Sequence, residues 1–282
     1  MNIDRVNKYL QNGHNHFDGW INNLDALLIA SISILQTQNG ISGDLFEIGV
    51  YKGKSFKLLQ LLTSKNEILH GIDEFIFVKK SEVIKNMETY ESYSAKFVLY
   101  EINTLNIDNI WLSNIIASGV RLLHLDGGHE YHEVNHDLIL FSNWVKDIGI
   151  LIIDDINDRE FPGVMLATCN YMFNGNFENQ IQFFPFMIGI NKLFCCRPHW
   201  VKWYQTKLIE TNVLTENSRI SRLWNQDILI PHCKYSMTNE DILYQLNFPL
   251  SSNQTKDINQ AKSYAKNVGP NNILKKLGIN RK

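Results

Sequence analysis

Acidic residues that follow apolar runs are the side chains in this sequence best suited to chemistry. Asp126 follows the apolar run 120–125 in the string DGGH, and Asp154 and Asp155 follow the run 148–153. Three hard oxygen donors at two strand ends suit Mg²⁺ or a similar divalent ion that keeps open positions for a substrate. Crowded carboxylates cost free energy unless a cation neutralises them, and no lysine or arginine falls inside the strings DGGH and LIIDDIND that hold these aspartates. The sequence therefore predicts a metal site on these three aspartates.

A histidine close to this predicted metal site could carry a proton. His129 lies three residues after Asp126. A metal-bound hydroxyl has a lowered pKa, and an imidazole can remove its proton near neutral pH. We therefore predict His129 as a general base. The alternative is that His129 only orients Asp126 or caps a helix.

The run 43–55, GDLFEIGVYKGKS, joins an apolar strand to a helix through two glycines behind an acidic residue, Glu47. Gly49 and Gly53 provide the backbone freedom and the absent side chain that let a ligand approach the turn. Ser55 begins a helix whose N-terminal amides point back toward the turn, although it could also serve only as a cap. This run predicts a binding site for a nucleotide-type cofactor.

Two common nucleotide sites fit this turn poorly. A P-loop needs four residues between its first glycine and the GK pair, but only three separate Gly49 from Gly53. Glu47 at the mouth of the loop would also repel a triphosphate. A nicotinamide dinucleotide site is supported by Asp73 after the second strand, but the spacing is ExGxxxG and not GxGxxG. Both alternatives are disfavoured.

The string HExxH occurs at residues 132–136 and is typical of zinc peptidases. No GxxH continuation follows it, and Glu160 is the only obvious third ligand. The apolar stripe of this helix also leaves His132 and His136 near its solvated side. We therefore interpret them as polar residues of a surface or cleft rim.

Apolar strands alternate with helical stretches through most of the chain, which predicts a parallel sheet with helices on both faces. The fold class expected is α/β, with a Rossmann-like, doubly wound, mostly parallel seven-stranded sheet that ends in an antiparallel hairpin. In such a sheet the carboxyl ends of the strands meet at one edge, so the acidic residues above should converge there. The predicted strands are 44–48, 68–72, 96–100, 120–125, 148–153, 181–188 and 192–196, with helices at 20–35, 55–62 and 131–146.

The strings GDLFEIGVYKGKSF, VRLLHLDGGHEYHEVNHDL, GILIIDDIND and GINKLFCC together resemble class I S-adenosylmethionine (SAM) methyltransferases. In detail they resemble the bacterial metal-dependent O-methyltransferases of the macrocin and macrolide-sugar type, over roughly residues 20–197. The resemblance implies that Asp126, Asp154 and Asp155 bind the metal and that His129 is the general base. It also implies an acceptor with two chelating oxygens, with sugar-like molecules favoured.

The predicted function is therefore SAM-dependent methyl transfer to a hydroxyl of a small molecule, with a divalent metal that chelates the acceptor oxygens. A non-catalytic SAM-fold binding or regulatory module and an NAD-dependent enzyme are the alternatives. The glycine turn would accommodate the methionine portion, Asp73 would accept hydrogen bonds from both ribose hydroxyls, and loop 157–163 would help to shape the acceptor pocket. The predicted cofactor residues are Glu47, Gly49, Tyr51, Gly53, Ser55, Asp73, Asn103 and Asp126.

The composition limits the classes of partner. A formal net charge of −2 gives no global polycation, so neither nucleic acid nor an anionic membrane is an expected partner. The N-terminal residues resemble no signal peptide and no run is long enough to span a membrane, which predicts a cytoplasmic protein. Homo-oligomer formation is left open. The four cysteines lack CxxC spacing and are expected to be reduced.

Four segments are expected along the chain. An N-terminal helical cap precedes the SAM-binding core, an extension then packs on the core, and a tail rich in Ser, Asn, Gln and Lys ends the sequence. Acceptor specificity is expected to lie in the cap and the extension. The boundaries are 1–40, 41–198, 199–250 and 251–282.

Overall fold

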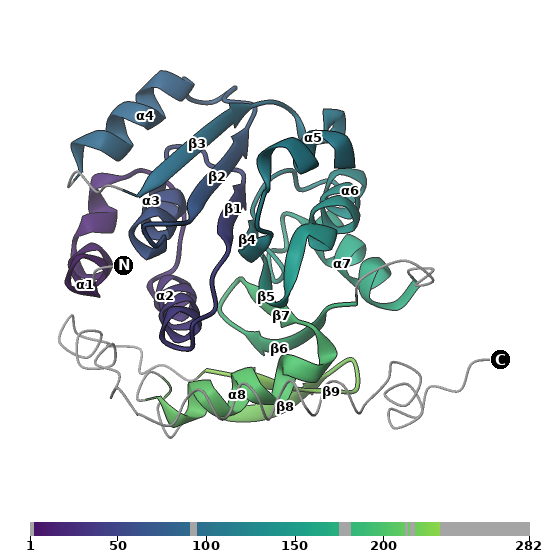
Figure 1. Cartoon of the computed structure of the whole chain (residues 1–282). Coiled ribbons are helices and arrows are strands. Elements are labelled where there is room, and N and C mark those ends of the chain that lie inside the picture. Colours follow the sequence, from purple (N-terminus) through teal and green to yellow (C-terminus); the bar gives the residue numbers. More distant parts are fainter. Residues whose placement is uncertain (1–2, 91–94, 175–181, 212–213, 215–217, 232–282) are drawn as a thin grey trace.

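The computed structural model describes residues 3–90, 95–174, 182–211, 214 and 218–231. Within these residues the chain forms a nine-stranded sheet in the order β3-β2-β1-β4-β5-β7-β6-β9-β8, with helices on both faces (Figure 1). The α/β, mostly parallel prediction is confirmed. The strands are β1 Asp44–Ile48, β2 Ile68–Asp73, β3 Lys96–Glu101, β4 Val120–Leu125, β5 Val145–Ile153, β6 Phe184–Ile188, β7 Leu193–Cys196, β8 Arg219–Leu223 and β9 Gln226–Ile230.

The predicted count of seven strands was wrong, because a second hairpin, β8–β9, extends the edge of the sheet. It joins through a short parallel contact between Met187 of β6 and Leu229 of β9. Trp224 and Asn225 make its turn with positive φ angles of 52° and 61°. The sequence lacks the Asn-Gly or Asp-Gly pair that usually marks such a turn, so the hairpin had no clear signal.

The strands from β1 to β5 are parallel, and β7 and β6 close this part of the sheet as an antiparallel hairpin. Alternate residues along a strand point to opposite faces. Accordingly Leu122 and Cys196 belong to one buried cluster, whereas Leu123 and Cys195 belong to the other. The sheet is therefore buried on both faces, which explains its nearly continuous apolar strands.

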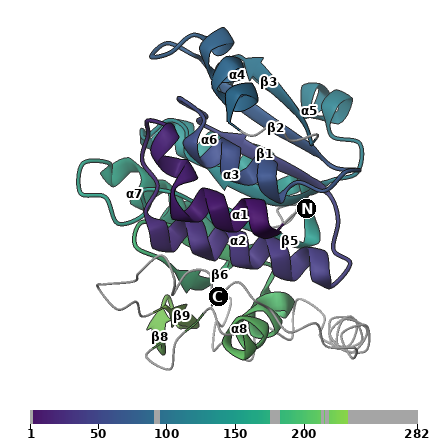
Figure 2. The ribbon, with the colours of Figure 1, turned by 90° about the vertical axis from the view of Figure 1, so that its left-hand side faces the viewer.

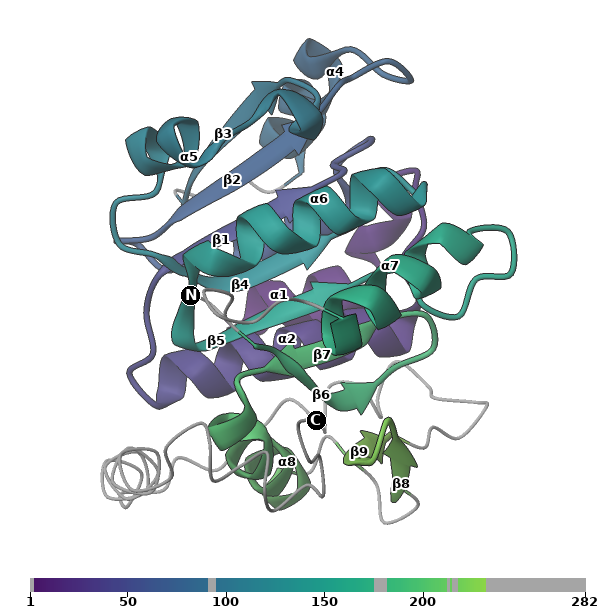
Figure 3. The same cartoon turned by 90° about the vertical axis from the view of Figure 1, so that its right-hand side faces the viewer.

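Helices α1, α2 and α3 cover one face of the sheet (Figure 2), and α5, α6 and α7 cover the other (Figure 3). Helix α2 is apolar nearly all round and buried from Leu24 to Gln36, as expected for a helix enclosed by the core. Asn22 caps it by accepting a hydrogen bond from the backbone N–H of Leu24. The helices are α1 Ile3–Gln11, α2 Asn23–Gln38, α3 Lys54–Leu62, α4 Lys80–Thr89, α5 Asn109–Ile115, α6 Tyr131–Phe141, α7 Pro162–Asn174 and α8 Val201–Glu210.

The helix predicted at 131–146 ends earlier, at Phe141. A 3₁₀ turn, Ser142–Trp144, follows it, and Val145 already pairs with Val120 of β4. The apolar spacing from Phe141 to Val145 suits a helix, but strand pairing overrides it. The sequence pattern alone could not separate these two outcomes.

The segment boundaries predicted from the sequence stay predictions. Helix α8 packs beside β6, and its Tyr204 hydroxyl donates to the backbone oxygen of Ile148 in β5. The predicted tail, 251–282, lies outside the described residues. Cys169, Cys195 and Cys196 are free thiols, whereas Cys233 lies outside the described residues.

No helix among the described residues has the length and apolar character needed to cross a membrane.

Candidate functional site

A cavity of about 570 Å³ lies at the carboxyl ends of β1, β2 and β4. Its walls are the turn after β1, the residues after β2, and the segment from Asp126 to His129 after β4. The carboxyl ends of the parallel strands are the usual position of a ligand site in an open α/β fold. Of the predicted cofactor residues, those that line this cavity are Gly49, Tyr51, Ser55, Asp73 and Asp126.

The turn after β1 is shaped by close backbone contact. Gly49 has a φ of 84°, and a Cβ atom built on it would lie 1.7 Å from the backbone oxygen of Asp126. Only glycine allows the β1 and β4 turns to approach so closely. Gly53, with a φ of 91°, is the N-cap residue of α3, and Tyr51 between them also has a positive φ of 48°. The strained backbone is therefore concentrated where the cavity wall is formed.

Asp73 holds this turn in place. Its Oδ2 accepts hydrogen bonds from the backbone N–H groups of Val50 and Tyr51 at 2.9 and 2.8 Å, and its Oδ1 accepts from that of Phe75 at 2.6 Å. Each carboxylate oxygen can accept more than one hydrogen bond, so Asp73 can hold the turn and still face the cavity. Glu74, which the sequence analysis did not single out, lies on the same wall and offers a second carboxylate.

Three of the predicted cofactor residues do not line the cavity: Glu47, Gly53 and Asn103. Glu47 was expected where β1 reaches the surface, but its side chain is fully buried and its Oε1 lies 2.7 Å from His124 Nδ1. Asn103 accepts a hydrogen bond from the backbone N–H of Leu105 and caps the 3₁₀ turn Thr104–Asn106. Its neighbour Thr104 lines the cavity instead.

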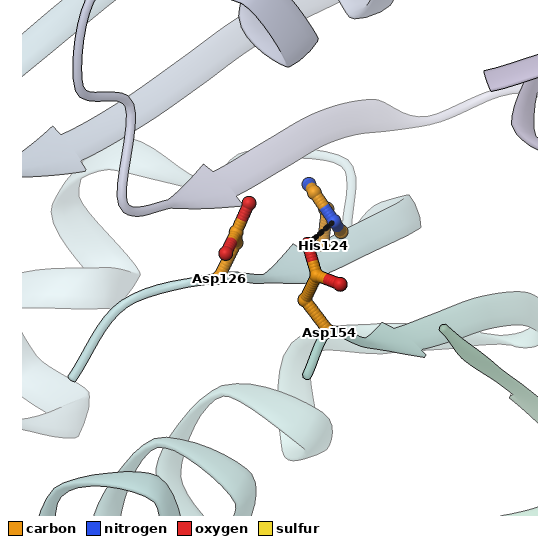
Figure 4. A group of neighbouring side chains, drawn as sticks. All are labelled: His124, Asp126 and Asp154. Atoms are coloured by element: carbon orange, nitrogen blue, oxygen red, sulfur yellow. Dashed lines mark ion pairs between the residues drawn. The ribbon is translucent and has the colours of Figure 1, made fainter. Parts of the chain in front are cut away.

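A buried network of charged and polar side chains lies behind the cavity. Its members are Glu47, His124, Lys192 and Asp154. Lys192 is 2% exposed, its Nζ contacts Asp154 Oδ2, and it also lies 3.0 Å from His124 Nε2. An ammonium has donors only, so His124 Nε2 accepts and His124 Nδ1–H donates to Glu47. Figure 4 shows His124 and Asp154 facing each other beside Asp126.

The pKa shifts in this buried network support an ion pair between Lys192 and Asp154. Burial alone would raise the pKa of Asp154, but the charge of Lys192, with a further contribution from the neighbouring His124, outweighs it and lowers that pKa. Burial alone would lower the pKa of Lys192, but Asp126 and Asp154 outweigh it and raise that pKa. The pKa of Asp126 is raised well above its usual value, first by burial and then by the nearby charge of Asp154. Lys192 is therefore an ammonium and Asp154 a carboxylate.

Lys192 is a site residue that was not predicted from the sequence. Its signal was a single lysine between the turn Gly189–Asn191 and the apolar run LFCC, at a sheet position that should be buried. Lysine is rarely fully buried unless its ammonium is paired, so such a position calls for a polar or acidic partner.

His129 and Asp155 form a second pair at the cavity rim. His129 Nε2 lies 3.0 Å from Asp155 Oδ2, and the side-chain amide of Asn191 donates to Asp155 Oδ1 at 2.6 Å. The imidazole also stacks on Phe161, with ring centroids 3.8 Å apart. Asp155 adopts a φ of 56°, a conformation that is strained for a residue with a side chain. The orientation of His129 is thus fixed from two sides.

The predicted metal ligands do not form one set. Among the described residues, two groups have ligand atoms within 4.8 Å of one another: His124, Asp126 and Asp154, and Asp126, His129 and Asp155. Asp154 already pairs with Lys192, and Asp155 already pairs with His129 and Asn191. The donors therefore do not fit a single three-aspartate metal site. Neither group contains His132 or His136 of the HExxH string, for which a zinc site was already disfavoured from the sequence.

A second hollow, of about 440 Å³, lies beside the cavity. Trp20 lines both spaces and stacks on Tyr51, with ring centroids 5.3 Å apart. The walls of this hollow are mostly polar and combine carboxylates with two cationic side chains. They include Asp25, Asp154, Asp155, Asp158, Arg159, Asn191 and Lys192.

Residues 46–156 match the family model described as a methyltransferase domain. Over 129 residues, or 43% of this chain, the sequence is 29% identical to the uncharacterized protein R132 of Acanthamoeba polyphaga mimivirus. That match spans 55% of the length of R132.

Among solved structures, the O-methyltransferase NovP has a TM-score of 0.53 at 17% identity, over 63% of this chain and 81% of NovP. CalS11, a TDP-rhamnose 3'-O-methyltransferase of calicheamicin biosynthesis, has a TM-score of 0.45 at 13% identity, over 60% of this chain and 85% of CalS11. The NovP likeness establishes the fold. Together with the domain match, it confirms the resemblance to class I methyltransferases.

Proposed function

From the methyltransferase domain that residues 46–156 match, we propose that this protein transfers a methyl group from SAM to a hydroxyl of a small molecule. One observation carries the proposal: a cavity at the glycine turn adjoins a polar hollow, and the His129–Asp155 pair stands at their boundary. SAM would occupy the cavity of about 570 Å³, with its sulfonium methyl directed toward the hollow.

The cofactor would be held by the turn that Asp73 fixes. Backbone groups of Gly49 to Tyr51 would face its methionine portion, and Asp73 and Glu74 offer carboxylate oxygens to the ribose hydroxyls. The sulfonium is a cation, and Asp126 supplies a nearby carboxylate on the cavity wall. Trp20 and Tyr51 would cover the mouth through their stacked rings.

The acceptor would bind in the polar hollow. Its carboxylates, Arg159 and Asn191 can exchange several hydrogen bonds with a polyhydroxylated molecule, and few apolar side chains compete with them. A sugar or a glycosylated metabolite is the acceptor class that such walls favour. Asp158 and Arg159, from the loop predicted to shape the acceptor pocket, lie on these walls.

His129 would act as the general base. Asp155 holds one ring nitrogen, and the other nitrogen can take the proton of the acceptor hydroxyl. The acceptor oxygen then attacks the methyl carbon in line, the C–O bond forms and the C–S bond breaks, leaving S-adenosylhomocysteine. Asp155 would stabilise the imidazolium that results. Catalysis on this scheme depends chiefly on positioning.

The divalent metal predicted from the sequence has no role in this scheme. The three predicted ligands are divided between a lysine and a histidine partner, so the residues present do not fit the group. No step of the proposed reaction therefore uses a metal.

Calorimetric titration with SAM, followed by transfer of a labelled methyl group to a panel of sugars and glycosides, tests the proposal. Binding of SAM together with labelling of a hydroxyl would support it. Failure to bind SAM would refute it. Binding without transfer to any acceptor of the panel would favour the alternative of a non-catalytic SAM-binding module.

A further inference from the structure

The turn between β6 and β7 brings a lysine into the centre of the site. Asp25 of the buried helix α2 accepts hydrogen bonds from the backbone N–H groups of Ile190 and Asn191, at 2.9 and 3.1 Å. The backbone N–H of Gly189 donates to the oxygen of Lys192 at 2.8 Å. The turn is thus fixed to the core, and the position of Lys192 with it.

The ammonium of Lys192 lies where the carboxylates of two strand ends meet. It contacts Asp154 at the end of β5 and donates to His124 of β4 at 3.0 Å. Asp126, just beyond β4, has a carboxyl oxygen within 4.8 Å of ligand atoms of both Asp154 and His124. Lys192 also reaches the wall of the polar hollow, so an acceptor oxygen bound there would meet an ammonium.

We propose that the Lys192 ammonium takes the place of a divalent metal in this site, and that methyl transfer by this protein is metal-independent. The inference deepens the proposed function, since it concerns how that same site is neutralised.

The burial of Lys192 and its positive charge both oppose the binding of a divalent ion at Asp154. A divalent ion on Asp154 would have to displace an ammonium that is buried and has a carboxylate and an imidazole as partners. The displaced ammonium would lose the partners that offset its burial, and an unpaired buried charge is strongly unfavourable. The ammonium also supplies the cation that crowded carboxylates require. Lys192 is therefore a positioning residue: it fixes Asp154 and presents a positive charge to the acceptor.

The test is a calorimetric titration of Mn²⁺ into the full-length protein saturated with SAM. For the wild type we expect no stoichiometric binding of Mn²⁺ and no effect of EDTA on SAM affinity. The variant Lys192→Ala frees the ligand atoms of His124, Asp126 and Asp154, so it should gain stoichiometric Mn²⁺ binding and melt at a higher temperature when Mn²⁺ is added. Lys192→Arg keeps the charge and should not bind the ion.

Lys57→Ala is the matched control, because Lys57 is also fully buried but lies on α3, with Gln60 and the backbone oxygen of Met87 as partners. Its loss should lower stability without creating a Mn²⁺ site. Stoichiometric Mn²⁺ binding by the wild type would overturn the inference, as would a folded Lys192→Ala protein that binds no Mn²⁺. If Lys192→Ala does not fold, the wild-type titration decides alone. The SAM titration reports separately on the proposed function.

Discussion

Two buried charged networks lie at opposite ends of β4, and they are built differently. Near the start of the strand, Arg121 uses all five of its N–H groups. Two go to Glu67 as a bidentate pair, and the others go to Ser33, Gln36 and the backbone oxygen of Leu62, all at 2.8–3.0 Å. The guanidinium is completely buried and completely satisfied. No N–H group of Arg121 is left to bind a ligand, and in this sense the network is closed.

At the other end of β4, the network around Lys192 is open, in the sense that some of its acceptor atoms have no partner or face a cavity. Glu47, Asp126 and Asp154 are three acidic residues, and of these Lys192 contacts Asp154 and acts on Asp126 through its charge. Glu47 Oε2 is buried and has no hydrogen-bond partner within the described part of the chain. Asp126 and Asp154 also form the walls of cavities.

The two networks differ in whether they have hydrogen-bonding atoms left for a ligand. A network whose donors and acceptors are all paired rigidifies the fold and leaves nothing for a ligand. A network with spare acceptors next to a cavity costs stability but can bind and orient a substrate. Local rules of this kind are most often broken at functional sites. Four substitutions test whether the two ends of β4 differ in this way.

The largest effect is expected from Arg121→Met. It leaves the buried carboxylate of Glu67 without its cation, which should lower the free energy of unfolding by about 3–5 kcal/mol. Urea denaturation measures the change. Arg222→Ala is the control, since its pair with Asp227 is largely exposed and should contribute less than about 1 kcal/mol. If both variants lost similar stability, the description of the Arg121 network as structural would be wrong.

His129→Ala should have the opposite profile. The side chain is 37% exposed, so its loss should barely change the urea midpoint, and SAM affinity should stay the same. Methyl transfer should fall by roughly 10²–10⁴-fold, because a general base is removed. His132→Ala, on the outer part of helix α6, is the matched control and should keep full turnover. Unchanged turnover of His129→Ala would refute the base assignment.

Gly49→Ala should affect both stability and binding. A left-handed backbone costs a residue with a side chain roughly 1–3 kcal/mol, and here the new Cβ would also overlap the backbone of Asp126. SAM affinity should fall, because the turn and Asp126 would be forced apart. Gly40→Ala separates the two causes, since Gly40 has a φ of 69° but nothing within 4 Å of its Cβ position. Equal losses in both variants would mean that the close approach at Gly49 is unimportant.

The smallest effect is expected at the surface, from Asp147→Asn. The hydrogen bond from His199 is the main cause that lowers the pKa of Asp147, with Trp200 and Arg197 adding to it. A lowered pKa means that the ionised form stabilises the fold above about pH 4, and that this contribution is lost as the pH falls through the folded-state pKa. The side chain is 64% exposed, so the variant should lose less than about 1 kcal/mol at pH 6.

Thermal melts of Asp147→Asn and the wild type at pH 6 and near pH 3 would measure this. The gap between their melting temperatures should close at the lower pH. A gap that persists there would show that the carboxylate charge is not its cause.

Much of the fold could be predicted from the sequence, because buried strands are short apolar runs with clear ends. The runs 44–48 and 120–125 matched observed strands to the residue, and the run 148–153 lies within β5, which begins earlier, at Val145. The hairpin that ends the core sheet was expected from residues 181–196. The β8–β9 hairpin was missed, because its strands are mostly exposed and its turn, Trp224–Asn225, has an uncommon sequence.

The candidate site was only partly predictable. Asp73, Asp126 and His129 were expected at strand ends and do line the cavity, because topology alone brings such ends together. Glu47 was placed at the surface, but the partner that retains it inside, His124, lies 77 residues away along the chain. Their roles in binding and catalysis stay predictions until the experiments above are done.

The parallel sheet, the glycine turn and the acidic residues at the edge of the sheet could all be predicted before the fold was known, because residue period, glycine spacing and strand ends are local properties. The tertiary structure decided how those charges are paired. Lys192 is 38 residues from Asp154, and a cation–carboxylate pair depends on distance in space. The carboxylates that suggested a metal when read in order thus meet an ammonium once the chain is folded.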